Sequence, residues 1–147
     1  MTHTILLSIH VAAGVLGLLL GPPTIATTLR GRGVSGAGLA YQGALAVITT
    51  TAVGFTVLDW ARWWPFVILA AGTEAAAATG WWVGRSRRTP GWHGRYIRLV
   101  CGSYISLVTA LLVVSWGTLA AWLLPTVVGT ILVERAAGQA ETRALPA

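Results

Sequence analysis

One acidic residue, Glu74, lies near the middle of an otherwise hydrophobic stretch of the chain, residues 66–84. A stretch of this length can cross the hydrocarbon core of a bilayer as a helix. A charged side chain placed there costs roughly 2.5–3.5 kcal/mol on insertion scales, so such residues are usually paired, protonated or functional. Glu74 is therefore the first candidate for a catalytic or proton-coupling group.

His10 is the second candidate and lies in another hydrophobic stretch, near the N-terminus. Gly14 follows it by four residues, so the two share one face of a helix. Gly17 and Gly21 continue a pattern of small residues that lets a second helix approach closely. His10 is accordingly predicted to point into a helical bundle, where an imidazole and a carboxyl group could together donate and accept protons.

A layer of polar residues is expected around these two groups. Counting about 1.5 Å of rise per residue places Glu74, His10 and hydroxyl groups of two further helices at similar depth. We predict a buried polar site with three candidate catalytic residues, Glu74 and His10 within it and Asp59 at its mouth. The residues predicted to bind substrate there are Thr50, Tyr104, Ser106, Trp60 and Trp64.

The composition excludes an ordinary soluble domain. The chain of 147 residues is 55% hydrophobic and only 10% charged, with a mean hydropathy of +0.72. Soluble domains contain about 25% charged residues. We therefore predict an all-α integral membrane bundle in residues 1–134, followed by a short tail, 135–147, in a bacterial inner or plasma membrane.

Five transmembrane helices are predicted, at residues 5–29, 39–58, 64–84, 96–114 and 118–133. The last two depend on a break at residues 115–117, because the uncharged run 99–133 is too long for one span of about 20 residues. Without that break the chain would have four spans. Arginines follow the first, third and fifth segments, so the positive-inside rule predicts an outside N-terminus and a cytoplasmic C-terminus.

The basic residues are all arginine, and the net charge is +6. They lie between apolar segments, which favours anionic lipid headgroups over nucleic acid as partners. The residues predicted to contact headgroups are Arg85, Arg87, Arg88, Arg95 and Arg98. The sequence has one cysteine and no metal-ligand spacing or nucleotide-binding fingerprint, so neither a metal nor a cofactor is predicted.

Two short segments carry a resemblance to a known family. Residues 10–14 (His-Val-Ala-Ala-Gly) and 92–98 (Trp-His-Gly-Arg-Tyr-Ile-Arg) resemble an uncharacterised family of small predicted bacterial multi-pass membrane proteins. The resemblance implies the membrane class and directs attention to His10 and His93. It implies no activity.

Three functional hypotheses follow from these residues. The first is an acid–base enzyme that needs no cofactor and catalyses isomerisation, cyclisation or epoxide opening of a small hydrophobic or lipid-like substrate. The second is a proton-coupled transporter of a small hydrophobic molecule, with Glu74 as the coupling group. The third is a non-catalytic accessory or assembly subunit, in which Glu74 faces out of the bundle towards a partner membrane protein. Homo-oligomers are compatible with all three. A haem protein is disfavoured because His10 and His93 are expected near opposite membrane surfaces.

Overall fold

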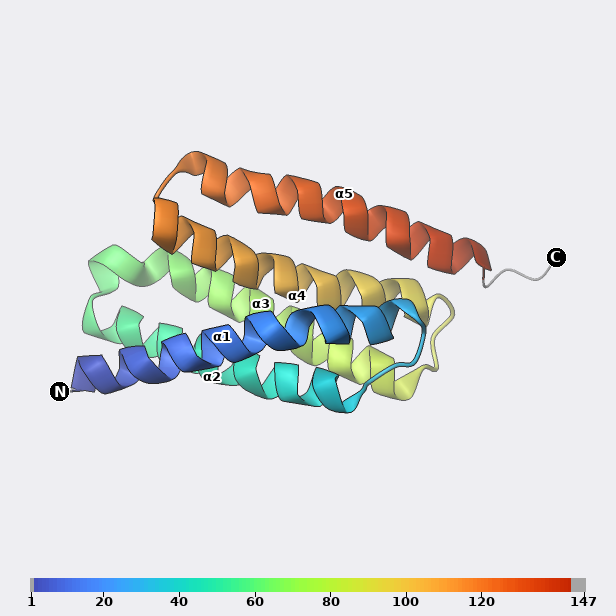
Figure 1. Ribbon diagram of the computed structural model, residues 1–147, viewed down its shortest axis with the longest axis horizontal. Helices are drawn as coiled ribbons and strands as arrows, with labels where there is room; N and C mark the ends of the chain where they lie inside the picture. The colour runs from blue at the N-terminus through green and yellow to red at the C-terminus, as the bar shows by residue number, and fades with distance from the viewer. Residues whose placement is uncertain (1, 144–147) are drawn as a thin grey trace.

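The computed structural model describes residues 2–143, with only the backbone described for Thr2 and Arg62. Five helices run alternately in opposite directions (Figure 1). Their bounds are α1 Thr2–Leu29, α2 Gly36–Leu58, α3 Trp60–Ser86, α4 Trp92–Trp116 and α5 Leu119–Arg143. Each is long and apolar enough to cross a membrane. The prediction of an all-α, five-span membrane protein is thereby confirmed.

The break between the last two spans is formed by Gly117. This residue ends α4 with φ of 62°, and its N–H donates to the carbonyl of Val113. The left-handed conformation favours glycine because any side chain would be strained there. α5 then continues to Arg143, past the span end predicted at residue 133, because Ala137 and Ala140 pack against Ile97 of α4.

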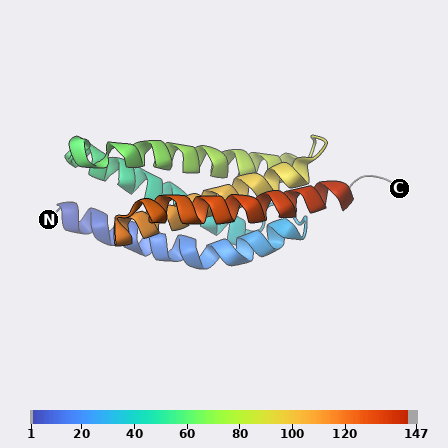
Figure 2. The same cartoon turned by 90° about the horizontal axis from the view of Figure 1, so that it is seen from above.

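α1 to α4 form a four-helix arrangement in which each helix packs on the next and α1 also packs on α4. α5 packs on α4 and lies to one side of the other helices (Figures 1 and 2). The N-terminus and the α2–α3 and α4–α5 connections lie together at what we call the N-terminal end (Figure 1). The α1–α2 and α3–α4 loops lie at the opposite, arginine-rich end.

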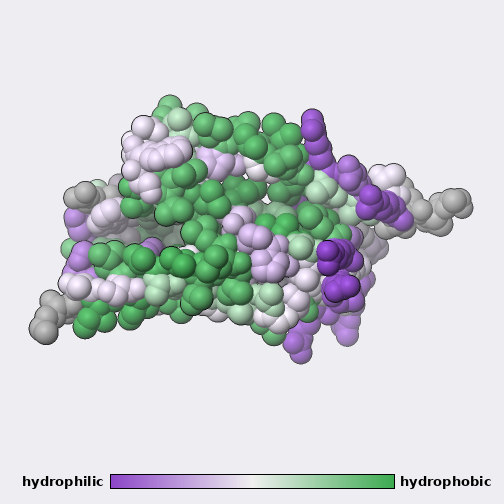
Figure 3. Space-filling view, viewed as in Figure 1, coloured by the Kyte–Doolittle hydropathy of each residue, from purple (hydrophilic) through white to green (hydrophobic). Residues whose placement is uncertain are grey.

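Hydrophobic and hydrophilic side chains occupy different parts of the surface. Figure 3 shows hydrophobic side chains along the middle of the helices and hydrophilic ones gathered at the arginine-rich end. Every arginine except Arg62 belongs to the part of a helix or loop nearest that end: Arg30, Arg32, Arg85, Arg87, Arg88, Arg95, Arg98, Arg135 and Arg143. This segregation is typical of a protein with one end among lipid headgroups.

Small residues bring α1 and α4 together in the middle of the bundle. A Cβ at Gly21 would overlap the ring of Tyr104, and a Cβ at Gly17 would lie 3.1 Å from Leu107. The hydroxyl of Tyr104 donates to the carbonyl of Leu18 at 3.3 Å, which ties the two helices. Gly17 and Gly21 of the predicted glycine face therefore mediate close helix packing, whereas a Cβ at Gly14 would meet no atom within 4 Å.

The two loops at the arginine-rich end are joined by Arg87, the residue that follows α3, and by Tyr96 of α4. Arg87 donates to the carbonyl of Arg32 and places its guanidinium over the ring of Trp92, 5.4 Å from the centroid. Tyr96 donates to the carbonyl of Gly33 at 3.1 Å. These contacts stabilise the α1–α2 loop, so Arg87 has a structural role in addition to its predicted headgroup contact.

Arg98 connects α4 to α5. Its side chain makes ion pairs with Glu134 at 3.0 Å and Glu141 at 2.7 Å. Within the part of the chain that the structure describes, Arg88 and Arg95 make no ion pair. The predicted set of headgroup-binding arginines thus divides into residues already bonded within the chain and residues available to lipid.

Candidate ligand cavity

A cavity of about 400 Å³ lies between α1, α2, α3 and α4 at the N-terminal end. Its volume falls in the range of roughly 300–1,000 Å³ that is typical of sites for small molecules. Most of the lining is hydrophobic. The apolar lining residues are Leu7, Val11, Val15, Leu18, Leu45, Ile48, Ala52, Phe55, Phe66, Leu69, Ala70, Leu107, Ala110, Leu111 and Val114.

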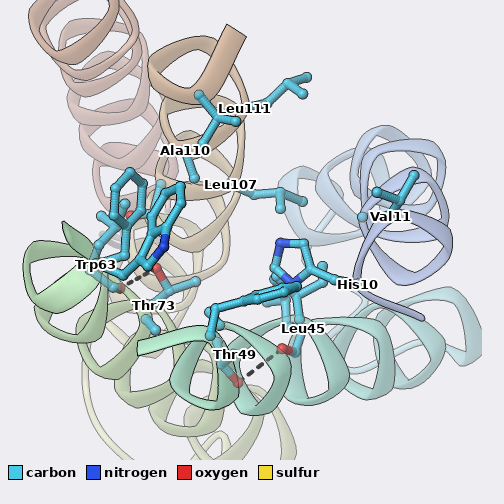
Figure 4. Close-up of a pocket in the computed structure, with 18 of the residues that line it drawn as sticks. His10, Val11, Leu45, Thr49, Trp63, Thr73, Leu107, Ala110 and Leu111 are labelled. Atoms are coloured by element: carbon cyan, nitrogen blue, oxygen red, sulfur yellow. Dashed lines mark hydrogen bonds between the residues drawn. The ribbon is translucent and has the colours of Figure 1, made fainter. Parts of the chain in front are cut away.

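Few polar side chains line this cavity. Two of them, Thr49 and Thr73, bond carbonyls of their own helices, Leu45 at 3.0 Å and Leu69 at 2.7 Å (Figure 4). Hydroxyl groups in apolar helices commonly bond the preceding turn in this way. The hydroxyl of Ser106 has no hydrogen-bond partner among the described residues, so it can still bond a ligand.

His10 is the most prominent polar group in the cavity. Its imidazole projects from α1 into the space between the helices (Figure 4). Nδ1 lies 2.7 Å from Oγ1 of Thr51 on α2. The ring also meets that of Phe55 edge to face, with centroids 5.7 Å apart and an interplanar angle of 82°. Contacts with Thr51 and Phe55 therefore fix the orientation of the ring.

Glu74 lies outside this cavity, half-buried where α3 packs on α2. One carboxylate oxygen accepts a hydrogen bond from Nε2 of Gln42 at 3.0 Å, and the other accepts from Oγ1 of Thr49 at 3.1 Å. The structure does not bring Glu74 and His10 into contact, so the prediction of one buried site containing both groups is not supported. Thr49 lines the cavity and also bonds Glu74, so it joins this carboxylate to the wall of the cavity.

We expect Glu74 to stabilise the packing of α2 on α3. Replacement by alanine leaves the side-chain N–H of Gln42 without its acceptor, whereas Thr49 keeps the carbonyl of Leu45. The loss should lower the free energy of unfolding by about 1–3 kcal/mol. Glu74→Gln keeps one acceptor oxygen and should cost less. Thermal unfolding in detergent measures both, with Thr50→Val as a control because Thr50 is exposed and bonds only its own helix. An alanine variant as stable as the wild type would contradict this role.

Of the residues predicted to bind substrate, only Ser106 lines the cavity. Thr50 is exposed and donates to the carbonyl of Ala46 at 2.6 Å. Tyr104 is used in the contact between α1 and α4. Trp60 and Trp64 are 64% and 49% exposed, on the outside of α3.

The start of α3 contributes different aromatic residues from those predicted. Trp63 and Phe66 line the cavity and pack on each other with centroids 5.6 Å apart. They share a helix face with Ala70 and Thr73, at the spacing of three to four residues that marks one side of a helix. Asp59 is exposed between α2 and α3 and is not part of the lining.

Comparisons of the chain with protein-family models, curated proteins and solved structures find no match. Within residues 2–143, no group of three or more histidine, cysteine, aspartate or glutamate side chains is arranged to hold a metal ion. The fold and the cavity together define a class: a multi-pass helical membrane protein with an apolar cavity among four of its helices.

Proposed function

We propose that this protein binds a small hydrophobic molecule in the cavity between α1 and α4. The observation that carries the proposal is an apolar cavity of about 400 Å³ with an imidazole projecting into it. Empty space deprives the side chains around it of van der Waals contacts. α1 and α4 pack closely at Gly17 and Gly21 but separate beside His10, and this separation leaves room for a ligand.

The bilayer is the proposed source of the ligand. Val11 and Val15 of α1 and Leu111 and Val114 of α4 line the cavity while remaining 48–65% exposed. A Cβ at Gly14 would meet no atom within 4 Å. Figure 3 shows the surface hollowed between these two helices near the N-terminal end. A hydrophobic molecule dissolved in the membrane could therefore enter sideways.

Acid–base catalysis is the chemistry that we propose for the bound molecule. A neutral imidazole can take a proton from one atom of a substrate and return it to another. The substrate then gains and loses no proton overall, as an isomerisation or cyclisation requires. His10 would exchange the proton, and Ser106 would orient the substrate. Glu74 would act indirectly, by holding the hydroxyl of Thr49.

Native mass spectrometry tests the proposed function. The protein would be purified in mild detergent from the membrane in which it was made, and the small molecules that it releases would be identified. We expect a hydrophobic compound other than phospholipid, in stoichiometric amount. Release of ordinary phospholipid alone would contradict a dedicated ligand site.

A second function, as an accessory subunit, is favoured by the position of Glu74. Its half-buried carboxylate lies beside Gln42 at the edge of the α2–α3 interface and outside the cavity. A polar group placed there can bond a helix of a partner membrane protein. Chemical cross-linking in the native membrane tests this: one partner protein should be captured by the wild type and lost in Glu74→Gln. Equal capture by both proteins would exclude Glu74 as the contact.

The orientation that we propose places the arginine-rich end in the cytoplasm, as the positive-inside rule requires. Arg85, Arg88 and Arg95 would then contact anionic headgroups of the cytoplasmic leaflet. The cavity would lie in the opposite half of the membrane.

A further inference from the structure

The hydrogen bonds around His10 determine which of its ring nitrogens carries the proton. Oγ1 of Thr51 lies 2.7 Å from the carbonyl of Val47 and 2.9 Å from that of Ile48. A threonine hydroxyl has a single proton, and in a helix it is usually given to such a carbonyl. The oxygen of Thr51 is therefore an acceptor for Nδ1 of His10.

The other nitrogen of His10 is then left with a lone pair. A neutral imidazole has one N–H, and the neutral form is favoured because a charge among apolar residues is costly. Nε2 has no hydrogen-bond partner among the described residues, and the ring that carries it projects into the cavity (Figure 4). Thr51 and Phe55 hold the ring, so a ligand meets an acceptor at this point.

We infer that the ligand carries a hydrogen-bond donor, a hydroxyl or N–H group, which donates to Nε2 of His10. This inference rests on the proposed function and adds the polar chemistry of the ligand to it. A hydrocarbon, an ether or a ketone without a donor would fill the cavity but leave Nε2 unpaired and desolvated. The favoured class is a hydrophobic alcohol, phenol or amine, and its O–H or N–H proton is the one that His10 can accept.

A pair of probe molecules of similar shape tests the inference. 1-Naphthol has a hydroxyl donor, whereas 1-methoxynaphthalene has an ether oxygen in its place. Binding of each to the protein in lipid nanodiscs would be measured by titration and corrected for partition into protein-free nanodiscs. We expect 1-naphthol to bind about five- to tenfold more tightly, the effect of one hydrogen bond.

Substitutions test whether His10 is responsible for the preference for 1-naphthol over 1-methoxynaphthalene. His10→Phe keeps a ring beside Phe55 but removes Nε2, and should reduce the preference to about one. Thr126→Val is the control, because Thr126 is exposed on α5 and bonds only the carbonyl of Trp122. The wild-type comparison decides the inference even if His10→Phe is unstable.

The outcomes separate this inference from the proposed function. Equal binding of the two probes by the wild type would overturn the inference while the cavity remains a ligand site. A preference that survives in folded His10→Phe would also overturn it. Binding of neither probe would contradict both the inference and the proposed function.

Discussion

A tryptophan at position 110 should abolish ligand binding without unfolding the protein. Ala110 lines the cavity from α4, beside Trp63 and Leu107 (Figure 4). An indole there would occupy the space that a ligand needs, so the affinity for 1-naphthol should fall at least about tenfold, or 1.4 kcal/mol. Filling a cavity commonly stabilises a protein by about 0.5–2 kcal/mol. Titration and thermal unfolding of Ala110→Trp would measure both effects.

Ala120→Trp is the matched control for this substitution. Ala120 is exposed on α5, which contributes no residue to the cavity. The control should bind 1-naphthol as the wild type does, even though it gains the same side chain. Undiminished binding by Ala110→Trp would show that the probe binds elsewhere.

Gly21→Ala should disrupt the contact between α1 and α4. The added Cβ would overlap the ring of Tyr104, which would have to move and lose its hydrogen bond to the carbonyl of Leu18. Forcing an extra methyl into a packed interface typically costs about 1–3 kcal/mol. We expect this loss in the free energy of unfolding, measured by denaturant titration in mixed micelles.

Gly43→Ala separates this clash from the general effect of replacing a glycine in a helix. Gly43 is exposed on α2, and a Cβ there would meet no atom within 4 Å. Alanine should be neutral or stabilising at that position by up to about 1 kcal/mol. Equal stability changes in the two variants would contradict a packing role specific to Gly21.

The five helices could be predicted because length and hydropathy determine a membrane span almost alone. Gly117 marked the break between α4 and α5, since no charge interrupts the run from residue 99 to 133. The end of α5 could not be predicted in the same way. It depends on contacts that bury Ala137 and Ala140 beside α4, and single alanines carry no sequence signal for such packing.

The depth of the candidate site residues in the membrane could be predicted from the sequence. The direction in which each side chain points from its helix could not. Successive residues on a helix differ by about 100° in direction, so neighbours at nearly one depth face different surroundings. Trp63 lines the cavity whereas Trp64 faces outward. Glu74, one position after the lining residue Thr73, faces α2 instead. The inward direction of His10 could be predicted because the glycine pattern on α1 indicates which side of that helix faces the bundle.

The hydrogen-bond and ion-pair partners of individual polar side chains could not be predicted from the sequence. Gln42 lies 32 residues before Glu74, and nothing in its local pattern indicates that it bonds this carboxylate. Arg98 pairs with Glu134 and Glu141 only because α5 packs alongside α4. Such pairs depend on helix–helix geometry, which hydropathy does not encode.

Photolabelling within the bilayer tests the central claim, that the cavity is a saturable ligand site. A small aryl diazirine bearing a hydroxyl group would be added to the protein in nanodiscs, irradiated, and mapped by peptide mass spectrometry. We predict labels on cavity residues such as Leu7, Leu69 and Leu107 that excess 1-naphthol suppresses. Labels confined to lipid-facing residues such as Leu123 and Ile131 of α5, and unaffected by competitor, would contradict the claim.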